Sequence, residues 1–245
     1  MDMLREMGIT VWVPREQAEV EIHEEPVEVA EPVAVAEPVE VPEPVGEPEQ
    51  PAAPAARDTS SPVAEMDWHA LQYTVAQCEQ CKLHRTRTQT VFGVGNRQAD
   101  WMVIGEAPGQ EEDRQGEPFV GPAGKLLNEM LKATGRARED VYIANVVKCR
   151  PPKNRDPHPD EEASCGPYLA RQIELIQPKV ILAIGKVAAN RLLGTDSSLG
   201  RLRGKAHRHP QFDIPVVVTY HPAYLLRTPA DKAKAWADLK LAMSL

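Results

Sequence analysis

Residues 101–105 read WMVIG, and the chain contains three further short runs that are as continuously apolar. These runs are VYIANVV at 141–147, KVILAIG at 179–185 and PVVVTY at 215–220. A strand that is apolar on both faces is typical of a parallel sheet covered by helices on both sides. The four runs therefore predict the strands of a central four-stranded parallel sheet.

Segments with the apolar spacing of helices lie between and after these runs, around residues 126–131, 169–176, 186–193 and 229–243. Strands that alternate with helices predict an α/β fold with three α/β/α layers. Ligands of such sheets bind at the carboxyl ends of the parallel strands. We therefore expect the chemistry in the loops that follow residues 105, 147 and 220.

The net charge of the chain, -8, is unevenly distributed. Residues 1–66 hold 16 Asp and Glu but only 3 Arg and no Lys, a net of -13. The remaining residues carry 25 Lys and Arg and 20 Asp and Glu, a net of +5. A mildly basic body predicts an anionic partner, which the whole-chain pI of 5.5 conceals.

The acidic part divides into two segments. Residues 16–65 are rich in Glu, Pro, Val and Ala, and dense proline prevents helices and central strands, so we expect a disordered linker. Residues 1–15 are more apolar and include Trp12. They are either a terminus without a role or a short linear motif for a protein partner. Residues 66–245 have the composition and length of one domain.

The sequence contains no run of about 20 apolar residues, so we expect no membrane-spanning helix. The first residues lack the basic and apolar regions of a secretory signal. We therefore expect a cytoplasmic protein that does not bind membranes, and we expect it to be a monomer.

The chain has four cysteines: Cys78 and Cys81, spaced as C-x2-C, and the more distant Cys149 and Cys165. Two disulfides are disfavoured in a reducing compartment, so metal ligation is the favoured interpretation. Four thiolates suit structural zinc and an iron–sulfur cluster equally well.

Two of the predicted loops carry features beyond a simple turn. Asn145 lies within an apolar run, where an amide is costly to bury unless it is hydrogen-bonded. It either bonds to neighbouring backbone or reads a planar polar ligand. The basic residues Lys148, Arg150, Lys153 and Arg155 follow it and suit phosphates, although such runs are also common on solvated surfaces.

The third loop reads HPAYLLR at 221–227. His221 is either a structural cap or a hydrogen-bond donor to a developing anion. Leu225 and Leu226 precede Arg227, an arrangement that suits an apolar wedge between bases with an arginine on a phosphate. The other interpretation is that both leucines lie in the core.

Together these segments resemble the family 4 uracil-DNA glycosylases, the iron–sulfur branch of their superfamily. The matching segments are C-x2-C at 78–81, GEAPGQEED at 105–113, GEPFVGPAGKLL at 116–127, NVVKCRPPKNRDP at 145–157, Cys165 and HPAYLLR at 221–227. The resemblance covers about residues 70–245, and the order of the motifs matches as well.

The resemblance implies an enzyme that hydrolyses the N-glycosidic bond of a flipped-out deoxyuridine in DNA and so starts base excision repair. It implies a structural [4Fe–4S] cluster on Cys78, Cys81, Cys149 and Cys165. The implied catalytic residues are His221 and a carboxylate, with Glu106 the first choice and Glu112 the second. The implied base-binding residues are Ala107, Phe119 and Asn145. The implied DNA-binding residues are Arg150, Lys153, Arg155, Leu225, Leu226 and Arg227.

The chain departs from related patterns at a few positions. Ala223 replaces a serine that is common in the family, and Ala107 replaces the glutamine of a sister branch. In that branch a histidine after the basic loop bonds to the sugar; here we expect His158 to be a bystander.

Two other functions compete: a DNA-binding module without catalysis, and a nucleotide hydrolase, which would need a phosphate loop that this sequence lacks.

Overall fold

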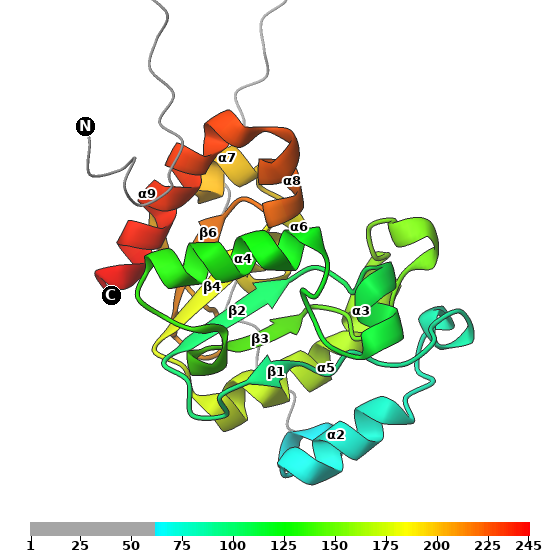
Figure 1. Ribbon diagram of the computed structural model, residues 1–245. Coiled ribbons are helices and arrows are strands. Elements are labelled where there is room, and N and C mark those ends of the chain that lie inside the picture. The colour runs from blue at the N-terminus through cyan, green and yellow to red at the C-terminus, as the bar shows by residue number, and fades with distance from the viewer. Residues whose placement is uncertain (1–61) are drawn as a thin grey trace, which may run out of the picture. The chain divides into compact units, whose positions relative to one another are not determined.

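The four apolar runs form the four central strands of one six-stranded sheet. A computed structural model describes residues 62–245, and Figure 1 shows the central part of the sheet with its covering helices. The strand order is β1-β3-β2-β4-β6-β5. The strands are β1 (Val94–Gly95), β2 (Trp101–Gly105), β3 (Tyr142–Asn145), β4 (Val180–Ile184), β5 (Ala206–Arg208) and β6 (Pro215–Thr219).

The central strands β3, β2, β4 and β6 pair in parallel, which confirms the predicted parallel sheet. The antiparallel edge strands β1 and β5 were not expected. They are only two and three residues long and partly exposed, so neither has the apolar run of a buried strand. The sheet is therefore mixed, with a parallel centre.

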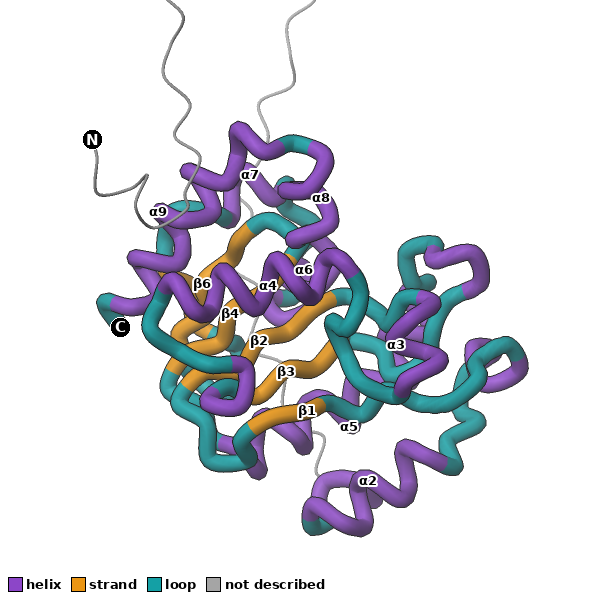
Figure 2. Tube along the Cα trace, viewed as in Figure 1, coloured by secondary structure: helices purple, strands orange, loops and turns teal. Residues whose placement is uncertain are grey.

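Helices follow each of the parallel strands. The α-helices are α2 (Trp68–Ala76), α3 (Gln110–Gln115), α4 (Pro122–Ala133), α5 (Pro159–Ile176), α6 (Lys186–Leu193), α7 (Leu199–Leu202), α8 (Pro222–Arg227) and α9 (Lys232–Met243). Short 3-10 helices are η1 (Pro62–Glu65), η2 (Lys82–Arg85), η3 (Arg138–Asp140), η4 (Pro152–Asn154) and η5 (Pro229–Asp231). Figure 2 shows the orange strands enclosed by these purple helices.

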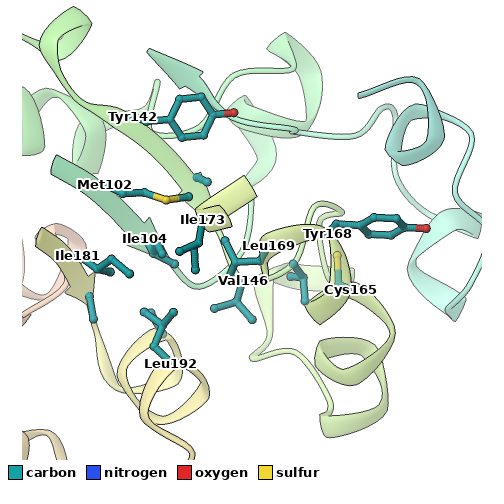
Figure 3. Close-up of a cluster of buried hydrophobic side chains, with 14 of the residues drawn as sticks. Met102, Ile104, Tyr142, Val146, Cys165, Tyr168, Leu169, Ile173, Ile181 and Leu192 are labelled. Carbon is teal, nitrogen blue, oxygen red and sulfur yellow. The ribbon is translucent and has the colours of Figure 1, made fainter. Parts of the chain in front are cut away.

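The side chains of each central strand alternate between two separate cores, as the pleat of a strand requires. Trp101 and Val103 of β2 pack with α4, α8 and α9, whereas Met102 and Ile104 pack with α2, α5 and α6. Figure 3 shows the second core, in which residues of β2, β3 and β4 meet α5 and α6. Two helical layers around one sheet confirm the predicted three-layer fold.

The predicted linear motif at 1–15 lies outside the described residues, as does most of the predicted linker at 16–65. None of the helices between residues 62 and 245 is long and apolar enough to cross a membrane.

Candidate active site and metal centre

A cavity of about 490 Å³ opens at the carboxyl ends of the central strands. It is bounded by all three loops that the sequence singled out, together with the segment that enters α4. Its lining residues are Glu106, Ala107, Pro108, Gly109, Glu112, Phe119, Ala123, Asn145, Pro151, Asn154, Arg155, His221, Ala223, Tyr224 and Arg227. The fold thus gathers the predicted catalytic and base-binding residues around one space.

Asn145 ends β3 and is only 2% exposed. Its Oδ1 atom has no hydrogen-bond partner among the described residues. The close approach of this amide depends on Gly105, because a Cβ there would lie 2.5 Å from Oδ1 and 2.6 Å from Cζ of Phe119. A buried, unpaired amide oxygen is costly, so its retention in a cavity indicates a ligand that donates to it.

Phe119 presents its ring to the same cavity and stacks against His221, with ring centroids 5.7 Å apart and planes 29° apart. Its backbone has a φ of 55°, in the left-handed region that a phenylalanine rarely adopts. Such a conformation costs about 1–3 kcal/mol and persists only where neighbours impose it. Gly124 leaves the space for this conformation, since a Cβ there would lie 1.7 Å from the Phe119 carbonyl oxygen.

His221 caps α8, and its Nδ1 accepts a hydrogen bond from the Ala223 amide at 3.1 Å. Because Nδ1 is an acceptor, the proton of the neutral ring is on Nε2. Burial, aided by the Arg227 guanidinium and opposed by the Glu112 carboxylate, lowers the pKa of His221 to about 4. His221 is therefore a neutral ring that presents one N–H donor at neutral pH.

The two candidate carboxylates differ in their surroundings. Burial and the neighbouring carboxylates of Asp156 and Glu162 raise the pKa of Glu106 to about 7. In contrast, Oε1 of Glu112 accepts the Val120 and Gly121 amides at 3.1 and 3.2 Å. Glu112 is thus engaged in holding the start of α4, while Glu106 lines the cavity and hydrogen-bonds with the carboxyl group of Asp156.

The structure separates the two leucines of α8. Leu225 is 1% exposed and belongs to the core beneath α4 and α9, which matches the alternative interpretation that it packs in the core. Leu226 is 46% exposed, and Arg227 beside it lines the cavity. On a short helix, consecutive side chains point in different directions, and for this reason only Leu226 is free to enter a base stack.

The residues of the predicted basic cluster also differ in their exposure and partners. Arg155 forms a two-pronged ion pair with the buried Glu161, at 2.8 and 2.7 Å, although it still borders the cavity. Arg150 bonds to Asn154 at 2.7 Å, and Lys153 is exposed. Lys148 is 1% exposed, so it cannot contact phosphates as the sequence suggested. Its Nζ instead donates to the Asn145 carbonyl and the Gln172 side chain.

All four cysteines are free thiols that line one small cavity. Three of the four sulfurs accept hydrogen bonds: Cys149 from Arg87 at 3.2 Å, Cys165 from the Lys148 amide and Cys78 from the Tyr168 hydroxyl, both at 3.3 Å. Donors aimed at sulfur fit thiolate ligands of a metal centre. The disulfide alternative has no support in this geometry.

The charge around this cavity also fits a metal centre. Lys148 lines it and is buried without any carboxylate partner among the described residues. A buried cation needs a compensating anion, and a metal held by four thiolates carries net negative charge. Across residues 62–245, no three His, Cys, Asp or Glu side chains are close enough together to hold a single metal ion.

Some residues of the site were not predicted. Tyr224 and Asn154 line the cavity within motifs that were noted, but no role was given to them. Arg138 bonds to the loop that carries Phe119. An arginine in the polar segment 135–140 gives no sequence signal for such a contact.

The fold and this cavity are those of a uracil-excising α/β protein. A model of the family described as "Uracil DNA glycosylase superfamily" matches residues 92–240, and the chain belongs to this family. The chain is 46% identical over 172 residues to the type-4 uracil-DNA glycosylase of Archaeoglobus fulgidus, covering 68% of this chain and 86% of the relative. It is 47% identical over 164 residues to the type-4 uracil-DNA glycosylase of Thermotoga maritima, and this match covers 65% of this chain and 83% of the relative. It is 41% identical over 182 residues to the type-4 uracil-DNA glycosylase of Pyrobaculum aerophilum, and this match covers 72% of this chain and 93% of the relative.

Proposed function

We propose that the protein is a monofunctional type-4 uracil-DNA glycosylase, which hydrolyses the N-glycosidic bond of deoxyuridine flipped out of DNA and so starts base excision repair. The similarity to three type-4 enzymes supports the activity. The single observation that carries the base specificity is the unpaired Oδ1 of Asn145 in the cavity. This oxygen accepts the N3–H of uracil, and the amide nitrogen donates to O4.

This arrangement separates uracil from cytosine, because cytosine has an acceptor at N3 and a donor at position 4. A mismatched base leaves the buried amide of Asn145 unpaired, and unpaired buried groups reject wrong substrates strongly. Phe119 covers the face of the uracil ring, and Ala107 leaves room at the cavity wall.

Cleavage of the N1–C1′ bond leaves negative charge on the uracil and positive charge on the sugar. The Nε2–H of neutral His221 donates to O2 as charge develops there. One such preorganised donor is typically worth about 3–4 kcal/mol in the transition state. The ionised form of Glu106 orients the attacking water or stabilises the sugar cation, because Glu112 is bound to the amides of α4.

Extrusion of the nucleotide leaves a gap in the base stack, which Leu226 fills. Arg227, Arg150 and Lys153 contact phosphates on either side. Arg155 supports them by fixing the loop through Glu161. His158 caps α5 and is not among the residues that line the cavity, which supports its role as a bystander and ordinary turnover.

Cys78, Cys81, Cys149 and Cys165 hold a [4Fe–4S] cluster in this proposal. The hydrogen bonds to three of these sulfurs and the buried Lys148 beside them support a thiolate-bound centre. The cluster supplies a structural link between η2, the loop after β3 and α5. The cytoplasmic location, the monomeric state and a protein partner for residues 1–15 stay predictions.

The test is incubation of the purified, metal-loaded protein with an oligonucleotide that contains one uracil, followed by alkaline cleavage. We expect scission at uracil and none at cytosine or thymine in the same position. Binding to the oligonucleotide without scission would favour the non-catalytic binding module. Release of phosphate from nucleotides, without scission, would favour the hydrolase.

A further inference from the structure

The segment between α3 and α4 holds the stacking ring of Phe119 in an unfavourable backbone conformation, with a φ of 55°. The segment lies outside regular secondary structure, so no ladder of backbone hydrogen bonds imposes this conformation. Side chains from other elements must supply the constraint. Two charged side chains do so from opposite sides.

Arg138 binds the carbonyl side of the segment. It begins η3, which follows α4 in the chain. Its Nη2 donates to the Pro118 carbonyl, and its Nη1 donates to the Phe119 carbonyl at 3.3 Å. Nη1 also donates to Oδ1 of Asn128 in α4 at 3.2 Å. The guanidinium thus ties the two residues before the turn to the helix behind them.

Glu112 binds the amide side of the same segment. Its Oε1 accepts the amides of Val120 and Gly121, directly after the residues that Arg138 holds. A cation on two carbonyls and an anion on two amides fix three consecutive peptide groups, and both charges hold the group that joins Phe119 to Val120. Burial lowers the pKa of Arg138, and the carboxylates of Glu117 and Glu112 oppose this, so the guanidinium stays charged.

Resting on the proposed function, we propose that Arg138 is a positioning residue for uracil excision, because it holds Phe119 in the pose that covers the uracil ring opposite His221. Arg138 does not line the cavity, so it acts through Phe119 and not on the substrate. A planar fork with several donors suits three acceptors in different directions, and a lysine offers only a point charge.

The variant Arg138→Met removes the fork and keeps much of the apolar stem. We expect its single-turnover excision rate constant to fall about 10- to 100-fold, because small misplacements in an active site have effects of this size. The dissociation constant for an uncleavable oligonucleotide should change less than about 2-fold. The excision rate constant of Arg138→Lys should lie between those of the wild type and Arg138→Met.

Arg136→Met is the matched control. Arg136 is a half-buried arginine two residues away that bonds to the Thr134 carbonyl and lies over Trp101, with no bond to the Phe119 segment. Its loss should leave the excision rate constant within about 3-fold of the wild type. Equal losses in the two variants would show a general loss of stability and overturn the proposal.

Phe119→Ala provides a double-mutant cycle. If Arg138 acts only through Phe119, then Arg138→Met should lower the rate less than about 2-fold in the Phe119→Ala background. A full, multiplicative loss in that background would overturn the positioning role. Both measurements require that the wild type excises uracil.

Amide hydrogen exchange tests the clamp independently of activity. In Arg138→Met the amides of Val120 and Gly121 should exchange faster than in the wild type and in Arg136→Met. Unchanged protection would overturn the proposal even in an active enzyme. If the wild type does not excise uracil, the proposed function fails. Faster exchange in Arg138→Met would still support the clamp in that case.

Discussion

Burial in the active-site cavity changes the charge of two side chains in a way that suits glycosidic cleavage. It raises the pKa of Glu106 to about 7, and it lowers the pKa of His221 to about 4. In both cases the charged form loses hydration. Near neutral pH the histidine is therefore an uncharged donor, while the glutamate changes between its two forms.

The pH dependence of excision follows from the directions of these two pKa shifts. Only the ionised form of Glu106 stabilises the sugar cation or activates water, so the single-turnover rate constant should rise with pH through about 7 and level off above it. His221 should add no inflection above about pH 5. Glu106→Gln should be slower and should lose this rise. A wild-type profile that is flat between pH 5.5 and 8.5 would contradict the assignment.

Asn145 should affect the chemistry far more than DNA binding. Asn145→Ala removes two hydrogen bonds to the base, and we expect the excision rate constant to fall about 100-fold or more. Affinity for an uncleavable oligonucleotide should change less than about 3-fold, because phosphate contacts supply most of it. Asn96→Ala, which changes an exposed amide that does not line the cavity, is the control. Equal losses in rate and binding would exclude a base-reading role.

At the scale of elements, α8 combines two roles in consecutive residues. Leu225 belongs to the core under α4, and Leu226 projects from the surface. Their separation depends on the direction of a one-and-a-half-turn helix that begins at Pro222, directly after the His221 cap. The same cap thus orients both the His221 ring and the exposed Leu226.

Leucine-to-alanine substitutions should distinguish these roles. Leu226→Ala should leave thermal stability unchanged and slow excision more from double-stranded than from single-stranded DNA, because only the duplex has a stack to fill. Leu225→Ala should lower the free energy of unfolding by about 2–5 kcal/mol through a core cavity. Thermal melting and excision on both substrates measure this. A stability loss for Leu226→Ala would reverse the assignment.

The connection from β3 to α5 links the base-reading strand to the cysteines. The buried Lys148 bonds to the Asn145 carbonyl, to Gln172 of α5 and, through its amide, to Cys165. Gln172 in turn donates to the Phe92 carbonyl and the Tyr142 hydroxyl. The network ties the cysteine cavity to the end of β3.

Lys148 should stabilise the metal centre through its charge. Lys148→Met removes the only buried cation that lines the cysteine cavity, so we expect less iron per chain and faster iron loss to a chelator. Iron and sulfide analysis and the visible spectrum measure this. Lys153→Met, an exposed lysine of the same loop, is the control. Equal iron content in both variants would rule out this role.

At the scale of the whole molecule, charge is divided between the two ends of the chain. Residues 1–64 carry 15 acidic residues and 3 arginines, a net of -12. A mobile or fixed anion near a DNA-binding surface competes with phosphates, and salt screens this competition.

Removal of residues 1–64 should leave excision intact and tighten DNA binding at low salt. The gain should shrink as ionic strength increases, because screening weakens the repulsion. Binding isotherms at several salt concentrations, together with the excision assay, measure both effects. Loss of excision on truncation would show that the acidic region takes part in folding or catalysis.

The sequence was sufficient for the central strands, the main helices and the family. Continuous apolar runs predict buried parallel strands because both faces of such strands need apolar side chains. The edge strands β1 and β5 escaped prediction because two- or three-residue pairings need only backbone groups. The motif residues Phe119, Asn145 and His221 could be chosen because their loops have a recognisable order.

The sequence by itself therefore determined the layered fold and the family, and it named the motifs that surround the cavity. Only the tertiary structure decided how neighbouring residues of these motifs are placed: Leu225 is buried and Leu226 exposed, Glu112 binds backbone amides, and Lys148 is buried within its basic run. Sequence patterns record the type and spacing of side chains. Direction, burial and hydrogen-bond partners arise from elements that are distant in the chain, as the contact between Arg138 and the Phe119 segment demonstrates.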